Sequence, residues 1–451
     1  MAAGANAAFL VEPARETPVG GEYEVVVLGG GPAGIAAAAA AAKQGRRTLL
    51  IERYGFLGGM GTAAGVTNFC GLHANIYGDI RQVVHGVADD LLGRIDRLGG
   101  LNTPHMIFGK THAQAYDTAA YKIAADDLLL SAGVDILFHA LAVGVVLDGE
   151  ARLRALMVET KSGRMAMLGQ VFIDCSGDGD LAAWAGAPYE VGDGQGNMLY
   201  PSTMFRINAV DAQKAGAAWD LIPRLMDEAE AKGARFPRKK PIVRPQRNPI
   251  EWRANLTQIR NADGTAVSGI DAEQLTYGEI EGRRQCRDVF QFIRASTPGF
   301  ERSYIVEIAP QIGIRETRRV KGSHMVSEDD ILDCADFPDA IGVNGWPVEA
   351  HIAGDVKFVF ARKPRGFNQL PYRMVVPSAG PRNLLVAGRC AAMTHDGQSS
   401  ARVSGPCFVM GQAAGAAAAL ALASGTEPRK LDVSQLQQRL EQDGAYLGRK
   451  W

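Results

Sequence analysis

The sequence predicts an α/β fold organised around a parallel, doubly wound sheet. Three observations support this fold class: a continuous apolar segment at Tyr23–Leu28, a glycine-rich turn directly after it, and an acidic residue, Glu52, at the end of the next apolar segment. A continuous apolar run is typical of a parallel strand that is covered on both faces. Because the chain has 451 residues, which is long for one hydrophobic core, we expect two domains.

The glycine-rich turn carries a dinucleotide-binding motif of the Rossmann type. It satisfies G-x-G-x-x-G at Gly29, Gly31 and Gly34. In this motif the glycines provide a tight turn, a close approach of the backbone to a pyrophosphate, and close packing of a helix on a strand. The helix N-terminus behind the turn offers free N–H groups and partial positive charge to the phosphates. Glu52 is placed to accept hydrogen bonds from the ribose hydroxyls, so the motif predicts a dinucleotide site without choosing between FAD and NAD.

Strand-like and helix-like segments of the same kind occur near both ends of the chain. Four further segments have the apolar composition of strands: Thr48–Ile51, 134–149, 153–177 and 383–388. Four segments have helical character, and glycines follow three of them: Ala33–Gln44, 77–99, 113–132 and Pro406–Ser424. Residues 190–370 have mixed short patterns and no dinucleotide motif. We therefore expect the nucleotide-binding domain to be assembled from both ends of the chain.

These patterns predict a discontinuous domain organisation. Residues 1–20 are expected to form a flexible N-terminal tail, because they lack the basic start and long apolar stretch of a secretory signal. Residues 21–190 and 371–451 are expected to form the nucleotide-binding domain. Residues 191–370 are expected to form an inserted α+β substrate or cap domain.

Composition excludes several classes of function. With 48 basic and 49 acidic residues the net charge is −1, which does not favour nucleic acid or an anionic membrane as a partner. The six cysteines are scattered without a C-x-x-C pair, so we expect reduced thiols, no metal site and a cytoplasmic location. No uninterrupted apolar run approaches the roughly 20 residues of a membrane span. The basic segment 235–247 is expected to be a solvated loop or edge rather than a nucleic-acid patch.

Several blocks of the sequence resemble a known family. They are ERYGFLGGMGTAAGV (52–66), FIDCSGDGDLAAWAGAPY (172–189), IGIRETRRVKG (312–322) and LLVAGRCAAMTHDGQSSARVSGPCFVMGQAAGAAAA (384–419). In this order they resemble the FAD-dependent oxidoreductase family of the glutathione-reductase-like flavoprotein superfamily. The resemblance covers most of residues 23–425 and is weakest between 195 and 300. It implies a Rossmann-like FAD-binding domain of the glutathione-reductase type, with FAD as the cofactor.

The resemblance also implies a set of cofactor-binding positions. The diphosphate turn, the ribose carboxylate and the stretch that leads to the flavin would comprise Gly29, Gly31, Pro32, Ala33, Gly34, Glu52, Arg53, Gly58, Gly59, Met60 and Thr62. The backbone of Val143 would contact adenine. The turn at Gly177 and Asp178 would lie beside the cofactor. The isoalloxazine end would meet Gly388, Arg389 and a loop over 395–405 that contains Val403. The helix from Pro406 would point its N-terminus at the flavin pyrimidine edge.

A second nucleotide site is formally suggested and rejected. Gly177, Gly179 and Ala182 match G-x-G-x-x-A, but Asp178 and Asp180 would place two carboxylates against a pyrophosphate. Disulfide reductases of the superfamily use such a site for NAD(P)H together with a C-x-x-x-x-C or C-x-x-C pair, and both pairs are missing here. The flavin-end segment AGRCAAMTHDGQSS also does not resemble that of aromatic-ring monooxygenases. Disulfide reductase and ring hydroxylase are therefore disfavoured.

Four residues are candidates for the chemistry. His395 is the leading acid or base, since imidazole titrates near neutral pH; the alternative is a histidine that bonds the loop backbone. Arg402 either clamps a substrate carboxylate or fixes the loop or the flavin. Arg315 either binds substrate or, paired with Glu316, joins the two domains. His73 is a weaker candidate.

Taken together, these features predict an FAD-dependent oxidoreductase. It would transfer a hydride between flavin N5 and a small polar organic substrate, with a carboxylate as one option. The alternatives are a flavin monooxygenase or oxidase, and a non-catalytic FAD-binding component of a larger complex. The substrate, the electron donor or acceptor, covalent attachment of FAD and a homo-oligomeric state stay open at this point.

Overall fold

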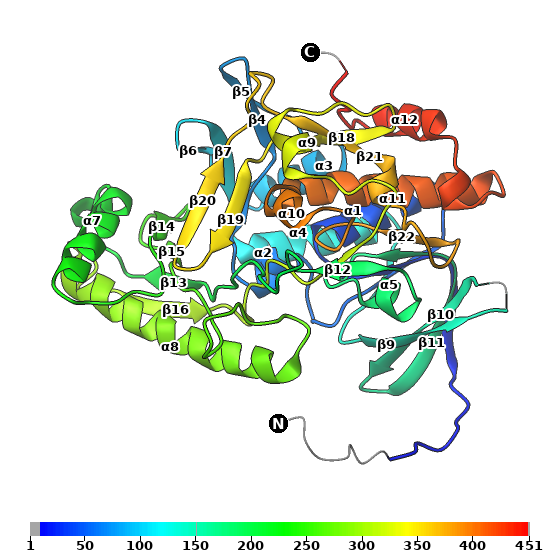
Figure 1. Cartoon of the computed structure of the whole chain (residues 1–451), viewed down its shortest axis with the longest axis horizontal. Helices are drawn as coiled ribbons and strands as arrows, with labels where there is room; N and C mark the ends of the chain where they lie inside the picture. The colour runs from blue at the N-terminus through cyan, green and yellow to red at the C-terminus, as the bar shows by residue number, and fades with distance from the viewer. Residues whose placement is uncertain (1–9, 150, 450–451) are drawn as a thin grey trace.

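A computed structural model describes residues 10–149 and 151–449, so residues 1–9 of the predicted tail lie outside the described part. Residues 10–18 form neither helix nor strand, and the first strand begins at Val19. Figure 1 shows a central sheet with helices on both sides and a smaller lobe to one side that carries its own sheet and helices. The α/β class predicted from the sequence is confirmed.

Five parallel strands form the centre of the main sheet. They are β1 (Val19–Leu28), β2 (Thr48–Ile51), β8 (Asp135–Leu137), β11 (Gly163–Asp174) and β22 (Leu384–Val386). Their spatial order is β8-β2-β1-β11-β22, which is the 3-2-1-4-5 order of a doubly wound dinucleotide-binding sheet. Two antiparallel strands, β9 (Leu141–Leu147) and β10 (Leu153–Thr160), extend the sheet from the first half of β11.

Two helices from opposite ends of the sequence pack tightly against each other on this sheet. They are α1 (Pro32–Lys43) and α11 (Ser404–Ala423), drawn in blue and orange in Figure 1. A Cβ added at Gly411 would lie 2.0 Å from the Ala33 carbonyl oxygen, and one at Gly415 would lie 2.1 Å from that of Ala37. Small residues are therefore required along this contact. Helix α11 is long and apolar enough by composition to cross a membrane, but 83% of its apolar window is buried inside the fold, as in a core helix.

Gly411→Ala is expected to destabilise the protein by about 1–3 kcal/mol, because the new methyl group would overlap backbone that belongs to α1. Denaturant unfolding monitored by circular dichroism would measure the change. Gly93→Ala is the matched control, since Gly93 lies inside helix α3 (Val87–Arg97) and its added Cβ would meet only the flexible Arg97 side chain, at 3.6 Å. The control is expected to stabilise by roughly 0.5–1 kcal/mol. Equal effects of the two substitutions would contradict the packing argument.

The smaller lobe has its own hydrophobic core. Its four-stranded antiparallel sheet has the order β14-β15-β13-β16 and packs against helices α7 and α8. The bounds are β13 (Phe205–Asn208), α7 (Ala218–Ala231), β14 (Ile242–Pro245), β15 (Trp252–Asn255), α8 (Ala272–Ser296) and β16 (Tyr304–Ile308). Residues between 320 and 376 contribute instead to the core of the main sheet. The structure has a separate hydrophobic core between Phe205 and Phe300. The bounds 191–370 of an inserted domain stay a prediction.

The remaining elements are mostly short, apart from α4, which packs against α1 and α3, and α12, which packs against α11. Before β8 they are α2 (Met60–Ala63), β3 (Asn68–Phe69), β4 (His73–Ile76), β5 (Asp79–Gln82), β6 (His105–Ile107), β7 (Thr111–Ala115) and α4 (Thr118–Ser131). After β11 they are α5 (Asp180–Trp184), β12 (Tyr189–Val191), α6 (Ala212–Ala215), β17 (Arg318–Val320), α9 (Glu328–Leu332), β18 (Ala340–Asn344), β19 (Val348–Ile352), β20 (Asp355–Val359), β21 (Asn368–Pro371), η1 (Tyr372–Met374), α10 (His395–Ala401), η2 (Pro428–Lys430) and α12 (Val433–Gln442).

Two predicted helices begin later than expected. Of the segment 77–99 only Val87–Arg97 is helical, because Tyr77, Gly78 and Gly86 have positive φ and form turns around β5. The segment 113–132 includes the end of β7, and the helix starts only after Asp117, whose side chain accepts a hydrogen bond from the Ala120 N–H as an N-cap. In both cases local turn chemistry overrides the apolar periodicity.

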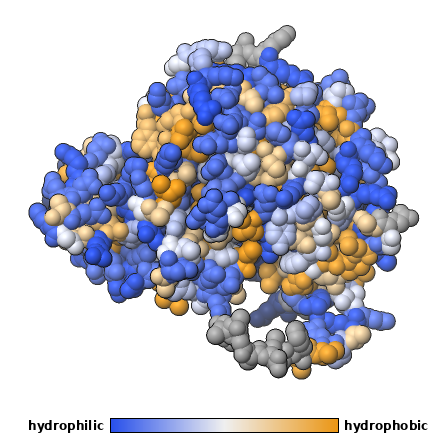
Figure 2. Space-filling model, in the orientation of Figure 1, coloured by the Kyte–Doolittle hydropathy of each residue, from blue (hydrophilic) through white to orange (hydrophobic). Residues whose placement is uncertain are grey.

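The surface agrees with the near-neutral composition. Figure 2 shows hydrophilic residues spread over the visible face, with hydrophobic ones in small groups among them. The lobe that carries α7 and α8 is mainly hydrophilic on this face.

Candidate functional site

The carboxyl ends of the parallel strands meet at one edge of the main sheet. The Gly29 N–H donates to the carbonyl oxygen of Ile51 at the end of β2 (2.8 Å), and the Cys175 N–H donates to that of Leu28 at the end of β1 (2.8 Å). The Ala387 N–H in turn donates to the carbonyl oxygen of Asp174 at the end of β11 (2.9 Å). Ligands of open α/β sheets bind at this edge, where the strand order reverses. The order reverses here between β1 and β11.

The glycine motif lies at that reversal. Gly29 has a φ of +101°, and a Cβ there would lie 2.4 Å from the Cys175 carbonyl oxygen. A Cβ at Gly34 would lie 1.7 Å from the Gly29 carbonyl oxygen. At Gly31 an added Cβ would meet only the Cα of Gly59, at 3.7 Å, so steric contact with the protein does not explain the glycine there. Gly29 and Gly34 are therefore needed for the turn itself. Gly31 leaves its backbone uncovered by a side chain.

Helix α1 begins at this turn without a side-chain cap. Its N-cap is Gly31, and Pro32 and Ala33 are its first residues. The first N–H groups of a helix have no partner within the helix and favour an anion. This bare, uncapped helix end fits a diphosphate.

Glu52 lies beside the turn, as the motif predicts. Its carboxylate accepts hydrogen bonds from the Gly30 N–H (2.7 Å) and the Tyr54 N–H (3.0 Å), and the residue is only 6% exposed. Burial raises the pKa of the Glu52 carboxyl, and the two hydrogen bonds oppose that rise. Each carboxylate oxygen keeps a lone pair for a further donor, as binding of a ribose requires.

The segment after Glu52 runs back along the glycine motif. The Gly58 N–H donates to the Gly30 carbonyl oxygen (2.8 Å), and α2 begins at Met60 directly after Gly59. The Thr62 hydroxyl donates to the Leu57 carbonyl oxygen (2.7 Å), so it shapes this turn from within. Further roles of these residues and of Arg53 towards a cofactor stay predictions.

Val143 occupies an irregular point in β9. The pairing of β9 with β10 shifts register between Gly144 and Ala142, so the Val143 backbone lies in a bulge. The chain leading to β9 contacts the backbone of Glu52, because the Ala140 N–H donates to the Glu52 carbonyl oxygen (3.2 Å). The predicted contact of Val143 with adenine is compatible with this position and stays a prediction.

Arg389 and Asp178 form a buried pair behind the strand ends. The Arg389 Nη2 donates to the Asp178 carboxylate and its Nη1 to the Thr317 hydroxyl, both at 2.9 Å. Thr317 also donates to Asp178 (2.9 Å). Gly388 has a φ of +90° and turns the chain past Ala33. A Cβ added at Gly388 would lie 3.0 Å from the Cβ of Ala33. The turns after β11 and β22 are thus tied together beside the N-terminus of α1, with Gly177 next to the Arg389 guanidinium.

His395 does not lie in a loop. The predicted loop over 395–405 is helix α10 followed by the start of α11, because the Thr394 hydroxyl caps α10 by accepting from the Gly397 N–H (3.0 Å). His395 Nδ1 contacts both carboxylate oxygens of Glu316, Oε1 at 3.0 Å and Oε2 at 2.9 Å. Glu316 is fully buried; its Oε1 also pairs with Arg319, and its Oε2 also accepts from the Leu199 N–H.

The Glu316 contact fixes the proton chemistry of His395. A carboxylate can only accept, so Nδ1 carries a hydrogen and Nε2 is the atom left to exchange a proton. Burial lowers the pKa of His395, but the hydrogen bond and charge of Glu316 outweigh it and the pKa is raised above its usual value. The arrangement is that of an imidazole base held by a buried carboxylate.

The other candidate residues are distributed differently. Arg315 is 6% exposed and donates to the Tyr200 carbonyl oxygen (2.7 Å). The Nε and Nη2 atoms of Arg402 are buried and have no hydrogen-bond partner among the described residues. The charges of the two arginines act on each other, and both pKa values are lowered, first by burial. The neighbouring Val403 is the N-cap of α11, and its side chain forms no cap hydrogen bond.

His73 lies in β4 beside His112, with ring centroids 5.6 Å apart. Burial and the charges of His112 and His85 lower the pKa of His73 to about 4. Its role in the chemistry stays a prediction.

Three charged residues that lie near Arg315, Arg402 or Cys70 are not marked by any sequence pattern. Arg238 is 1% exposed and lies in the basic segment expected to be solvated, so that expectation is wrong at this position. Arg253 in β15 is 8% exposed, and Glu349 in β19 acts electrostatically on Arg238, Arg315 and Arg402. No motif marks these residues, because long-range pairing of the small sheets brings them together.

Polar atoms near the predicted flavin end are also left without partners. Within the described residues, Gln398 Oε1 and Ser399 Oγ in α10 are buried and unpaired, while Gln398 Nε2 donates to the Arg389 carbonyl oxygen (2.6 Å). Together with the bare helix end at Gly31 and the free lone pairs of Glu52, these atoms fit a polar cofactor such as FAD.

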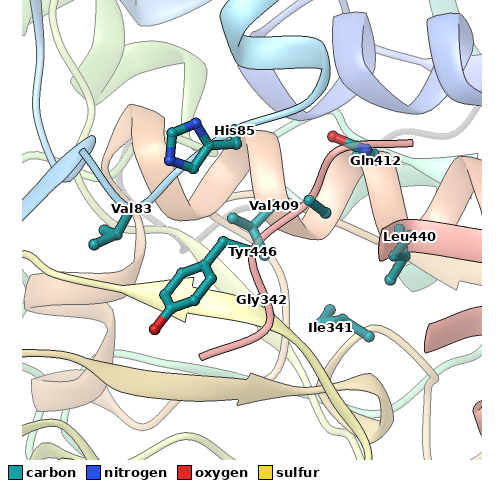
Figure 3. Close-up of a pocket in the computed structure, with 9 residues that line it drawn as sticks. Val83, His85, Ile341, Gly342, Val409, Gln412, Leu440 and Tyr446 are labelled. Atoms are coloured by element: carbon teal, nitrogen blue, oxygen red, sulfur yellow. The ribbon is translucent and has the colours of Figure 1, made fainter. Parts of the chain in front are cut away.

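The cavity drawn in Figure 3 lies elsewhere. It has a volume of about 10 Å³, room for roughly one water molecule, between α11, β18 and the C-terminal segment. His85, Gln412 and Tyr446 line it, and none of the predicted site residues does. Among the residues placed by the structure, no cluster of three or more histidine, cysteine or acidic side chains is arranged to hold a metal ion.

Comparison with known proteins places the sequence in a family. Residues 24–440 match the sequence profile of a family described as FAD dependent oxidoreductase. A search of curated protein sequences returned no match.

A search of solved structures returned matches at low sequence identity and with TM-scores below 0.5. A geranylgeranyl bacteriochlorophyll reductase-like protein from Thermoplasma acidophilum has 15% identity and a TM-score of 0.49, covering 94% of this chain and 83% of that one. The p-nitrophenol 4-monooxygenase PnpA from Pseudomonas putida has 10% identity and a TM-score of 0.45, covering 96% and 90%. The aromatic hydroxylase CabE has 12% identity and a TM-score of 0.46, covering 94% of this chain and 66% of CabE.

Proposed function

The chain belongs to the family of FAD-dependent oxidoreductases, and from this premise we propose that it transfers a hydride between a small polar organic substrate and FAD bound at the carboxyl edge of the main sheet. The chain is an enzyme, and FAD is its cofactor. We also propose that the FAD-binding domain is of the glutathione-reductase type, which the 3-2-1-4-5 strand order supports at the level of the Rossmann sheet.

The residues at the sheet edge suit the parts of FAD in order. The N-terminus of α1 at Gly31 would hold the diphosphate, and Glu52 would accept from the ribose hydroxyls. Arg389, fixed by Asp178 and Thr317, would stand near the flavin end together with α10. When bound, FAD supplies the two-electron chemistry of the reaction.

The observation that carries the proposal is the contact between His395 and Glu316. For oxidation of a C–H bond next to a hydroxyl or amine, the substrate loses a hydride and also a proton from that oxygen or nitrogen. His395 would take this proton at Nε2, because Nδ1 is engaged with Glu316 at 2.9 Å. In the reverse direction the protonated imidazole would return it. Arg319 pairs with the same carboxylate and holds it in its orientation towards His395.

Anaerobic mixing of the FAD-loaded protein with a panel of small hydroxy and amino compounds tests this function. The expected result is loss of the visible flavin absorbance with one class of compound and the appearance of a carbonyl or imine product. A protein that neither retains nor rebinds FAD would contradict the proposal. Consumption of one oxygen per hydroxylated product, with no anaerobic bleaching by the organic substrate, would favour a monooxygenase instead.

A further inference from the structure

Four arginine side chains form an unusual group beside α10: three are buried, and the fourth, Arg402, is half-buried with its Nε and Nη2 atoms buried. We call Arg238, Arg253, Arg315 and Arg402 the arginine cluster. Buried arginines are rare unless they are paired with an acidic group. Among the residues that the structure describes, none of these four forms an ion pair, although ion pairs are common elsewhere in the chain.

The cluster is assembled from four distant segments. Helix α10, which ends just before Arg402, packs on β19, the strand that carries Glu349. The segment of Arg238 is tied to the β19–β20 hairpin by the Lys239 N–H, which donates to the Gly354 carbonyl oxygen (2.9 Å). Arg315 reaches the same hairpin through Tyr200, whose N–H donates to the His351 carbonyl oxygen (3.1 Å).

Arg253 joins the cluster from the smaller lobe. Its Nη1 donates to the Val66 carbonyl oxygen (3.3 Å), close to the segment that carries Cys70. Cys70 links it to Arg402, because both guanidinium charges act on the Cys70 thiol. The Cys70 N–H donates to the Ser404 hydroxyl (2.9 Å), two residues after Arg402. Burial, as the largest cause, raises the pKa of the thiol to about 12, so Cys70 is neutral and supplies no counter-charge.

Several N–H groups of the arginine cluster have no acceptor. Buried nitrogens without a partner among the described residues are Nε and Nη1 of Arg238, Nε of Arg253, and Nε and Nη2 of Arg402. Arg315 uses Nη1 on a backbone carbonyl. A guanidinium has five N–H donors and no acceptor, so these nitrogens require an acceptor from outside the cluster.

Acidic groups of the protein do not balance the charge. Glu349 acts on three of the arginines, but its carboxylate is held by the Trp346 indole (2.9 Å) and His351 (3.1 Å). Asp355, which acts on Arg238, already pairs with Lys240 (3.0 Å), and Glu316, which acts on Arg402, pairs with Arg319. The four guanidinium groups therefore have one carboxylate among them, that of Glu349, and it acts on three of them.

We propose that the arginine cluster binds the substrate, and that the substrate is a small organic acid carrying two carboxylates. This assignment rests on the proposed function and specifies its substrate class. Planar guanidinium groups bind carboxylates through two parallel hydrogen bonds, and an excess of three positive charges suits a dianion better than a monoanion. Arg402 directly follows α10 and His395 begins it, so one short helix carries both a member of the arginine cluster and the proposed acid or base.

Binding of simple dicarboxylates to the FAD-loaded protein tests the proposal. Malonate, succinate and glutarate are titrated in turn, with succinamide as a neutral analogue, acetate as a monoanion and inorganic phosphate as a dianion of another geometry. Isothermal calorimetry and perturbation of the flavin spectrum measure binding. We expect one dicarboxylate to bind at least about tenfold more tightly than acetate or phosphate, with no binding of succinamide. Binding of phosphate as tightly as any dicarboxylate would overturn the carboxylate assignment.

Variants then locate the site. Arg315→Gln and Arg402→Gln are each expected to weaken dicarboxylate binding about 10- to 100-fold with FAD content unchanged. Arg284→Gln, at an exposed arginine of α8 that pairs with Glu281, is the matched control and should bind as the parent does. Unchanged binding in both cluster variants, or loss of FAD in place of loss of the dicarboxylate, would overturn the proposal. A protein that never binds FAD but still binds dicarboxylates through these residues would instead contradict the proposed function.

Should either variant fail to fold, the comparison of succinate, succinamide and acetate on the parent protein still decides the matter. Equal binding of all three, or binding of none of the dicarboxylates, would overturn the inference.

Discussion

Replacing Gly31 by alanine is expected to give a folded protein that retains little FAD. The Gly31 backbone has φ −76° and ψ −177°, which any residue adopts, and its added Cβ would meet only Gly59 Cα at 3.7 Å. The methyl group would instead occupy the face of the turn that a pyrophosphate approaches. Overpacking of about 1–3 kcal/mol corresponds to an affinity roughly 5- to 150-fold weaker. Flavin absorbance per chain and a fluorescence titration with FAD would measure it.

Two further glycine variants separate binding from folding. Gly34→Ala would place a Cβ 1.7 Å from the Gly29 carbonyl oxygen, so it should lower the melting temperature as well as FAD content. Gly93→Ala in α3 should retain FAD fully. If Gly31→Ala bound FAD as the parent does, the turn would not be the diphosphate site.

Replacing His395 by glutamine is expected to slow reduction of bound FAD by substrate about 10²- to 10⁴-fold, the usual contribution of a positioned acid or base. FAD content should stay unchanged, because the cofactor positions proposed above do not include His395. Anaerobic stopped-flow measurement with the substrate identified in the panel would give the rate. A loss of less than a few-fold would leave His395 with a structural role on α10.

The pH dependence of the rate in Glu316→Gln shows whether Glu316 positions His395 for proton transfer or only stabilises the fold. The hydrogen bond and charge of Glu316 raise the pKa of His395, whereas burial lowers it. Without the carboxylate the pKa falls, so the neutral imidazole persists to lower pH. If His395 acts as a base, the rate rises with pH through this pKa, and the rising limb should move to lower pH in the variant. Histidine proton resonances, assigned with His395→Gln, would follow the same shift without any substrate; an unmoved midpoint would rule out the positioning role.

The nucleotide-binding half of the fold could be predicted because its signals are local. The strand before Gly29, the spacing of three glycines and the acid at Glu52 all lie within one short stretch of chain, and each has a single steric or hydrogen-bonding reason. The return of the C-terminal segment was also predictable, since the apolar strand and the alanine-rich helix after it need a sheet and a partner helix to cover them. Gly411 and Gly415 explain why that helix is so poor in large side chains.

The substrate side was much less predictable. Arg238 lies among basic residues and prolines, and its burial depends on the β19–β20 hairpin, which is more than a hundred residues away in the sequence. Glu349 has no motif at all around it. Thr394 is a local signal on this side, because its spacing to Gly397 is that of an N-cap and marks α10 as a helix. Turn residues such as Gly86 likewise shorten a helix that periodicity alone extends.

The interlock of α1 with α11 has a consequence for biosynthesis. The ribosome releases Gly29 and Glu52 early, yet the helix that covers α1 and the strand that completes the sheet beside β11 emerge only after residue 384. Domains generally fold as units once their contacts are available. A nascent chain stopped at residue 380 should thus remain a client of chaperones, and acquisition of the flavin should follow termination of translation.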